Sequence, residues 1–533
     1  MSKGSPVLTR AIRGLLLTGL VGALQLAPAY ADDNPPGDES APPPGNTAAL
    51  GKIEVTGTRI RRADVEAARP VTVVTKEQIK ATGLTSIGDV LQTLASAGAA
   101  PNAQFNNGGT GRTNADLRNL GPNRLLVLLD GRRIMPGLGG DVDMTTIPLS
   151  IVDHLEILQD GASAVYGSDA ISGVINIITV KSYVGAEADA YLGAYDAHAD
   201  GGGWDGKEQS YDYTIGSAGD KGAMVFNVSY LNDSPVYAGD RTLSKEPVIG
   251  AGLDAGSFLT PNGTFETVPA SGVCPGTATF VQGSCFMTLV NAPTDHPSLG
   301  NFRDATGADA YNYAPANYLI TPSERTGLYV QGHYDLADNL SFAGKFLYNR
   351  RESSQELAPN TIDFGEFGQD FANGQPLAIS GQNPFNPFHR DLVSDPNDPC
   401  ITAGTCDQLQ FLGRRLSEAG NRVADQTVDS YQFSGGFNGY FHLFGNEWDW
   451  DAGYSYASNF ETDRSADVVD TARMQQELGV PGQAPCGGGA SPGCTPLNIF
   501  GGAGSITPAM LDYFLSEEHD ITRQDMRDYT ANT

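Results

Sequence analysis

The stretch that decides the fold is residues 147–179, which read IPLSIVDHLEILQDGASAVYGSDAISGVINIIT. Two runs rich in β-branched and other apolar residues, 156–158 and 174–179, predict strands. Between them lie Asp160-Gly161, a typical turn dipeptide, and a run of small residues that ends at Gly173. The block therefore predicts two strands of one compact unit, separated by a connection of small residues.

The residues before this block alternate between strand and helix signals. Residues 71–74 predict a strand, and residues 75–78 have the spacing of a helix capping box. A second short helix is predicted from Ile87, where apolar residues recur at i, i+3, i+4 and i+7 and are interpreted as core. Residues 124–129 predict a buried strand that turns back at Asp130-Gly131 into a hairpin. We expect a mixed α/β domain in this part of the chain.

After residue 183 the sequence changes to segments in which every second residue is apolar. Seven segments are predicted as strands: 186–195, 209–217, 223–231, 325–336, 340–350, 427–444 and 447–460. Tight turns join them at one end, whereas the connections 233–323, 352–425 and 462–533 are very long. Strands close to the 9 to 11 or so residues that cross a bilayer, with long loops on one side, predict an antiparallel transmembrane β-barrel. The alternative, a soluble β-sandwich, predicts loops of ordinary length.

The N-terminus has the three parts of a secretory signal peptide, predicted at residues 1–31. Basic residues precede an apolar run over 14–27, and Ala29-Tyr30-Ala31 matches a cleavage site. An uncleaved anchor is disfavoured because this run is shorter than the roughly 20 residues of a spanning helix. The prolines and acidic residues of 32–52 predict a disordered periplasmic tether.

The six cysteines fall into three close pairs, all within the long connections. Export to an oxidising compartment and short spacings favour local disulfides. A metal site is disfavoured because C-x-x-C spacing and a nearby histidine pair are absent. The predicted disulfides are Cys274–Cys285, Cys400–Cys406 and Cys486–Cys494.

The chain has 33 Lys and Arg against 62 Asp and Glu in 533 residues, a formal net charge of −29. Nucleic acid is excluded as a partner, because such an acidic protein repels a phosphate backbone. Residues 108–112 lack the Gly-Lys-Ser/Thr ending of a phosphate-binding loop, and Ser163 falls one residue short of a nucleophile elbow. The scattered histidines lack ligand spacing. The sequence therefore predicts no enzyme, metal site or cofactor.

Five blocks in a specific order carry a family resemblance. They are 53–59 (IEVTGTR), 70–75 (PVTVVT), 117–121 (LRNLG), 126–131 (LVLLDG) and 147–179. The sequence resembles the N-terminal part of a TonB-dependent outer-membrane receptor of a Gram-negative bacterium. The resemblance implies a plug domain, bounded here at 53–183, inside a barrel of about 22 strands. Residues 184–533 supply about seven of those strands, so we expect an N-terminal part of a longer receptor.

The resemblance also implies a function and partners. Such a receptor binds a scarce, large substrate and imports it with energy from the TonB complex of the inner membrane. A ferric siderophore is the default chelate substrate, and a carbohydrate, cobalamin or peptide is an alternative. Outer-membrane lipid is the expected environment. A different class of function stays open: a surface binding or adhesion β-barrel without active transport, which needs neither a plug nor a TonB-binding segment.

Two sets of candidate site residues follow. A β-branched, proline-free segment after the tether is the TonB-box candidate, suited to β-strand addition, or alternatively the first strand of the plug. Its residues are Ile53, Glu54, Val55, Thr56 and Gly57. The Gly- and Asn-rich loops 102–114 and 136–145 are expected at the plug apex, where small and polar residues adapt to a ligand. The ligand-binding candidates are Asn106, Asn107, Arg112, Asn114, Asp141 and Asp143.

Overall fold

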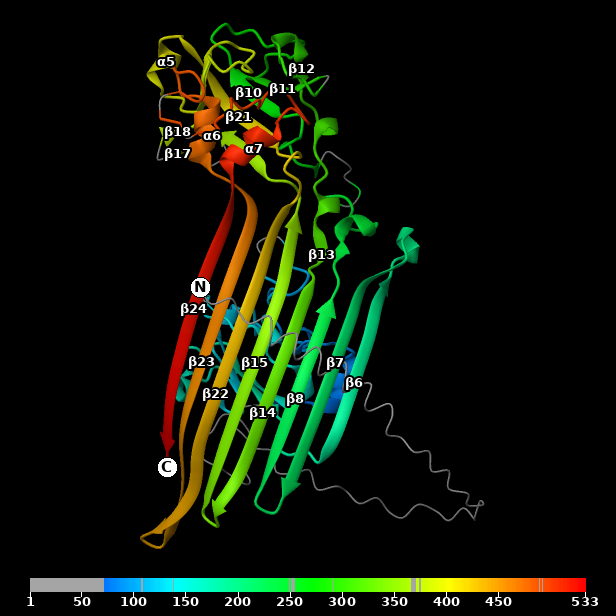
Figure 1. Ribbon diagram of the computed structural model, residues 1–533, viewed down its shortest axis with the longest axis vertical. Coiled ribbons are helices and arrows are strands. Elements are labelled where there is room, and N and C mark those ends of the chain that lie inside the picture. Colours follow the sequence, from blue (N-terminus) through cyan, green and yellow to red (C-terminus); the bar gives the residue numbers. More distant parts are fainter. Residues whose placement is uncertain are drawn as a thin grey trace, which may run out of the picture.

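The structure, a computed structural model, has three parts (Figure 1): an α/β domain, a long sheet, and a second compact domain at one end of the sheet. It describes residues 71–106, 109–137, 139–248, 250, 255–290, 292–365, 371–372, 375–487, 489–490 and 492–533. The predicted signal peptide, tether and TonB box lie outside the described residues, as does Asn107. None of the helices described is both long enough and apolar enough to cross a membrane.

The N-terminal domain is built on a five-stranded sheet in the order β1-β4-β5-β2-β3. Its strands are β1 (Val71–Thr75), β2 (Leu125–Leu129), β3 (Arg132–Arg133), β4 (Val152–Leu158) and β5 (Gly173–Thr179), and its helices are α2 (Lys76–Thr82), α3 (Ile87–Gln92) and α4 (Ser163–Tyr166). The pair β2 and β5 is parallel, whereas the other neighbours are antiparallel. Ile87, Leu155 and Ile175 are fully buried in its core, as are several apolar residues of β2.

The local signals of the sequence are confirmed in this domain. Thr75 Oγ1 accepts a hydrogen bond from the Gln78 amide, and Gln78 Oε1 accepts one from the Thr75 amide, which completes the capping box of α2. Asp130 and Gly131 have φ angles of 50° and 78°, as a type I′ turn requires. β4 begins at Val152, earlier than predicted, and the four-residue helix α4 interrupts the run of small residues.

The long sheet has eight antiparallel strands in the order β24-β23-β22-β15-β14-β8-β7-β6. They are β6 (Gly185–Asp196), β7 (Trp204–Gly219), β8 (Gly222–Asp233), β14 (Ser323–Ala337), β15 (Leu340–Leu357), β22 (Arg422–Leu443), β23 (Asn446–Val469) and β24 (Leu515–Asn532). All seven predicted strands are present. Within the described residues, β6 and β24 end the hydrogen-bonded order, so closure into a barrel stays a prediction.

β24 corrects the expectation that residues 462–533 form one long loop. The strand pairs with β23 along most of its length, from Asn532 opposite Asp451 to Leu515 opposite Val469. Charged and polar residues occupy both of its faces, so the alternation that marked the other strands is absent. Pairing with a neighbouring strand, rather than its own pattern, makes this segment a strand.

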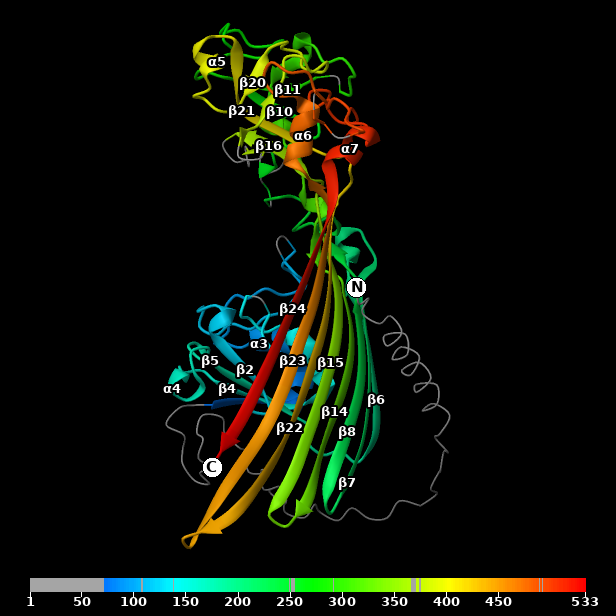
Figure 2. The ribbon, with the colours of Figure 1, turned by 60° about the vertical axis from the view of Figure 1, so that its left-hand side comes forward.

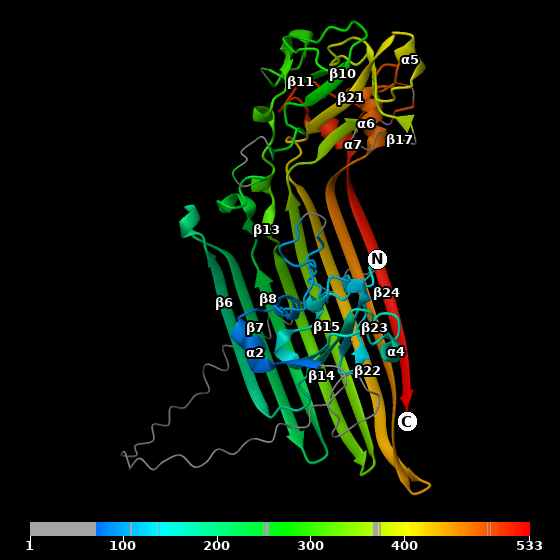
Figure 3. The same ribbon diagram turned by 180° about the vertical axis from the view of Figure 1, so that it is seen from behind.

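The two faces of the sheet differ in chemistry. On β22, Gln426, Gln432 and Ser434 are buried on one face, and Gln432 Nε2 donates to the carbonyl of Arg133 in the N-terminal domain at 3.2 Å. At odd-numbered positions of the same strand, Tyr431, Phe433, Phe437 and Phe441 are exposed on the opposite face. Figures 2 and 3 show the N-terminal domain on one side of the sheet, and its contacts with Gln432 and Arg351 identify that side as the polar face. A soluble β-sandwich has the reverse pattern, with its apolar face covered.

The long connections form a second domain, which corrects the expectation of separate loops. We call it the apical domain, comprising the described residues of 255–320, 358–421 and 470–514. Its main sheet has the order β12-β11-β10-β21-β20-β19, and β16 also pairs with β21. The elements of these connections are β9 (Val236–Tyr237), β10 (Thr264–Val268), β11 (Cys285–Leu289), β12 (Phe302–Asp304), β13 (Tyr318–Ile320), β16 (Thr361–Gly365), β17 (Phe371–Ala372), β18 (Gln375–Pro376), β19 (Ala378–Ile379), β20 (Asp391–Val393), β21 (Cys406–Arg415), α5 (Pro399–Thr402), α6 (Thr471–Leu478) and α7 (Pro508–Phe514).

One apolar core unites the three connections of the apical domain. Phe265 of the first, Leu412 of the second and Phe514 of the third are all fully buried in it. Three disulfides join Cys274 to Cys285, Cys400 to Cys406, and Cys486 to Cys494, the pairs that the spacing predicts, and Cys285 is itself buried in this core. Figure 1 shows the domain beyond the end of the sheet where the long connections emerge.

Candidate functional site at the contact between domain and sheet

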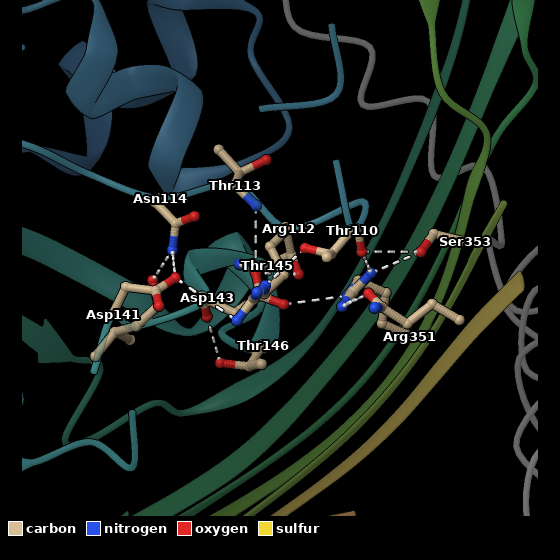
Figure 4. Close-up of polar contacts among 12 residues, drawn as sticks. Thr110, Arg112, Thr113, Asn114, Asp141, Asp143, Thr145, Thr146, Arg351 and Ser353 are labelled. Carbon is tan, nitrogen blue, oxygen red and sulfur yellow. Dashed lines mark hydrogen bonds and ion pairs between the residues drawn. The ribbon is translucent and has the colours of Figure 1, made fainter. Parts of the chain in front are cut away.

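The site begins at the short 3₁₀ helix η2 (Met144–Thr146). Asp143 caps this helix: its Oδ1 accepts hydrogen bonds from the amide of Thr145 at 3.0 Å and from the hydroxyl of Thr145 at 2.7 Å. The capping bonds fix the orientation of the carboxylate. The other oxygen, Oδ2, therefore points at the sheet and accepts a hydrogen bond from Arg351 Nε at 3.1 Å (Figure 4).

Arg351, on β15, is the centre of this contact. Its side chain is 0% exposed, and its guanidinium is surrounded by acceptors. Besides Asp143, it donates to the carbonyl of Thr110 at 2.7 Å, to Ser353 Oγ at 2.7 Å and to Gln426 Oε1 at 2.9 Å. A buried charge is tolerated when it is paired and hydrogen-bonded in this way. Arg351 thus fastens the N-terminal domain to two strands of the sheet.

Arg112 and Asp141 form the outer part of the same cluster. Arg112 Nε donates to Thr110 Oγ1 at 2.7 Å, and its Nη1 lies 3.7 Å from Asp141 Oδ2. Asp141 Oδ2 also accepts from Asn114 Nδ2 at 2.7 Å. Arg112, Asp143 and Arg351 line a cavity of about 40 Å3 together with Glu461 and residues of β22 and β24. This space holds a few water molecules and is too small for a chelate.

The structure places the described ligand-binding candidates in two groups. Arg112, Asn114, Asp141 and Asp143 share one network (Figure 4). Asn106 lies apart and donates from Nδ2 to the carbonyl of Glu356 at 2.6 Å. Asn106 and Asn114 are 7% and 2% exposed, so both are committed to contacts inside the protein.

A second contact lies at the carboxyl ends of the parallel strands β2 and β5. Asp130 accepts hydrogen bonds from the Thr179 amide at 2.8 Å and the Thr179 hydroxyl at 2.6 Å, and it also pairs with Lys345 of β15. Tyr329 of β14 donates to Thr179 Oγ1 at 2.9 Å. The turn predicted from Asp130-Gly131 therefore also carries a docking residue.

The docking residues of the sheet were missed by sequence reasoning. Lys345 falls within the predicted strand 340–350 but was given no role, whereas Arg351 and Gln426 fall just outside the predicted strands 340–350 and 427–444. A signal was available, because Lys345 and Arg351 share one parity on β15, whereas the aromatic Phe342 and Phe346 share the other. What the alternation did not show is which charge of the N-terminal domain would face each of them.

Comparison with known proteins gives the class of this arrangement. The arrangement to be compared is a small α/β domain docked on the polar face of a long antiparallel sheet whose other face is apolar. Residues 63–174 match the family model of the TonB-dependent Receptor Plug Domain. The resemblance seen in the sequence is confirmed: the N-terminal domain is a TonB-dependent receptor plug domain, and we call it the plug domain below.

Solved structures of such receptors are similar to this chain. The siderophore receptor PirA from Pseudomonas aeruginosa has a TM-score of 0.31 and 11% identity, over 74% of this chain and 53% of that chain. The closed form of the ferric-catecholate import receptor Fiu from E. coli K12 has a TM-score of 0.38 and 14% identity, over 87% and 53%. The siderophore receptor PiuA from Acinetobacter baumannii has a TM-score of 0.34 and 13% identity, over 75% and 47%. The chain thus spans about half the length of these receptors.

Proposed function

We propose that this protein is a TonB-dependent receptor of a Gram-negative outer membrane that imports a scarce, large substrate. The observation that carries the proposal is the plug domain docked on the polar face of the sheet. The opposite face supports a lipid environment: Tyr431, Phe433, Phe437 and Phe441 are between 40% and 47% exposed there. A band of this kind is costly in water but is what the lipid-facing side of a transmembrane sheet presents.

Energy for import comes from the TonB complex in this proposal. The candidate segment, Ile53 to Gly57, precedes the plug domain and suits capture as an added strand. The polar bonds at Arg351 and Lys345 hold the plug domain to the sheet until it is pulled. Hydrogen bonds and ion pairs suit this task, since water replaces them when the contact opens.

The substrate class that the resemblance gives first is a ferric siderophore, with carbohydrate, cobalamin and peptide as alternatives. The test deletes residues 53–57 and measures binding and cellular accumulation of a panel of ferric chelates and glycans. Retained binding with lost accumulation supports energised import. Accumulation equal to that of the intact protein contradicts it.

The apical domain favours the second candidate function, a surface binding or adhesion protein. Its shared core and three disulfides make a preformed surface at the far end of the sheet. An adhesion protein would bind its partner equally well without residues 53–57 and would accumulate no substrate in either form. The same experiment therefore separates the two functions.

A further inference from the structure

A cavity beside the Arg351 contact lies between α3 of the plug domain and strands β6, β7, β8 and β14. Its volume is about 230 Å3, and it adjoins a second cavity of about 390 Å3. Both are lined by residues 83–85, Tyr191 and Arg325. Together they follow the boundary between the plug domain and the inner face of the sheet, the region that a substrate would cross during import.

The first cavity holds more negative charge than the fold compensates. Asp89, Glu208 and Asp233 line it with one cation, Arg325. Glu208 and Asp233 are direct partners in the register of β7 and β8, and like charges in that position destabilise a sheet. Arg325 Nη2 reaches Asp233 Oδ2 at 3.4 Å. One arginine leaves the site with an excess of two negative charges.

Unused hydrogen-bond acceptors accompany this charge. Glu208 Oε1 and Asp233 Oδ1 are buried and accept no hydrogen bond. Asn349 lines the adjoining cavity, is 3% exposed, and its Oδ1 also has no donor. A buried acceptor without a donor costs free energy comparable to a lost hydrogen bond. Arg325 Nε is a buried donor without an acceptor at the same place, so three unpaired acceptors stand against this one donor. This balance favours a ligand that brings more donors than acceptors and carries positive charge.

The geometry favours an organic cation over a metal ion. Across the part of the chain that the structure describes, one group of three acidic, cysteine or histidine residues has its ligand atoms within 4.8 Å of one another, and it is Asp398 with the bonded Cys400 and Cys406. The carboxylates of the first cavity therefore do not converge on one ion. Tyr191 and Tyr195 also line it, and aromatic rings attract ammonium and guanidinium groups.

We propose that this cavity binds an organic ammonium or guanidinium group. Carboxylates accept its hydrogen bonds, and the tyrosine rings face its apolar stem. Binding of such a group to the purified protein is independent of transport. In the importing receptor, this cavity selects substrates that carry a cationic group. That role, unlike the binding itself, rests on the proposed function.

The test measures binding of spermidine to the full chain in detergent by calorimetry, at about 0.15 M salt to screen the surface charge. We expect one saturable site, with affinity reduced at least about tenfold in the Asp89→Asn/Glu208→Gln variant, which keeps the Arg325–Asp233 pair. Glu208→Gln alone should give an intermediate loss. The matched control is Asp220→Asn, an exposed acid in the turn between β7 and β8, and it should bind like the unchanged protein.

Two results would overturn the proposal. One is equal spermidine affinity in the double variant and the unchanged protein. The other is displacement of spermidine by equimolar Ca2+ alone, which would indicate a metal site. Loss of import on deleting residues 53–57 leaves this binding unaffected, so failure of one proposal is distinguishable from failure of the other.

Discussion

The plug domain and the apical domain are attached to the long sheet in different ways. The plug domain reaches it through side chains, chiefly the Asp143–Arg351 and Asp130–Lys345 pairs. The apical domain is continuous with the strands, because it consists of their connections. Separation of the plug domain breaks these side-chain contacts and takes Tyr329 and Leu347 of the sheet out of its apolar core. The apical domain cannot separate in this way, because the strands of the sheet continue into it. Within the proposed function, we therefore expect the plug domain to move and the apical domain to stay fixed to the sheet.

The largest expected effect is on the plug contact. Replacing Arg351 with methionine leaves the buried carboxylate of Asp143 without its partner, which should cost about 3–5 kcal/mol. We expect faster proteolysis of the plug domain, with the apical domain unchanged, as mapped by mass spectrometry of the fragments. The matched control is Arg523→Met on β24, whose side chain is 62% exposed. Equal proteolysis of the two variants would show that the plug domain is held by other contacts.

The next effect lies in the apical domain. Removing Cys274 and Cys285 together, as serines, opens a loop of 11 residues and should destabilise this domain by about 2–3 kcal/mol. Thermal unfolding followed by peptide-resolved hydrogen exchange measures it. The plug domain should keep its protection. Loss of protection in both domains at once would contradict their independence.

A smaller effect is the pH dependence of stability, which we expect in the apical domain. Glu477 of α6 is fully buried, and burial raises its pKa to about 8 from an ordinary value of 4.5. The folded apical domain therefore holds a proton that the unfolded chain releases. Its stabilising effect is complete below pH 4.5 and is lost as pH rises through about 8. Glu477→Gln should flatten the decline of the apical melting temperature between those values. An unchanged slope would contradict a buried neutral carboxyl.

The smallest effect is at an exposed ion pair of the plug domain. The hydrogen bond from Arg133 lowers the pKa of Asp169, so its contribution is present above the ordinary value of 3.8 and lost as pH falls below it. Both side chains are partly exposed, at 36% and 50%. Asp169→Asn should change stability by about 0.5 kcal/mol or less at neutral pH, measured by urea unfolding. A larger loss would place this pair among the contacts that hold the domain.

The same comparison shows what the sequence can predict. The plug domain is continuous in sequence, so its capping box at Thr75 and its turn at Asp130 were found from local patterns. The core of the apical domain joins Phe265 to Leu412 and Phe514, residues more than a hundred positions apart, and no local period connects them. β24 was not predicted, because it is a strand through its pairing with β23 and has no alternating pattern of its own.

The candidate site shows the same limit. Loops 102–114 and 136–145 were expected at the plug apex, and four of their candidate residues do form one network. Their partner Arg351 comes from a strand more than two hundred residues away in sequence. Composition indicated polar loops. Only the folded structure shows that Asp143 of these loops pairs with a charged residue of the sheet.

The most direct test of the account asks whether import requires the plug domain to leave the sheet. The carbonyl of Thr110 lies 3.3 Å from Ser353 Oγ, so these two residues are neighbours across the contact. The test replaces both with cysteine, and mass spectrometry verifies the new disulfide before transport is measured. Accumulation of a bound substrate is measured in energised cells before and after reduction, with each single variant as control. We predict that the oxidised pair binds substrate without accumulating it and that reduction restores accumulation. Equal accumulation in fully cross-linked and reduced cells would contradict the account.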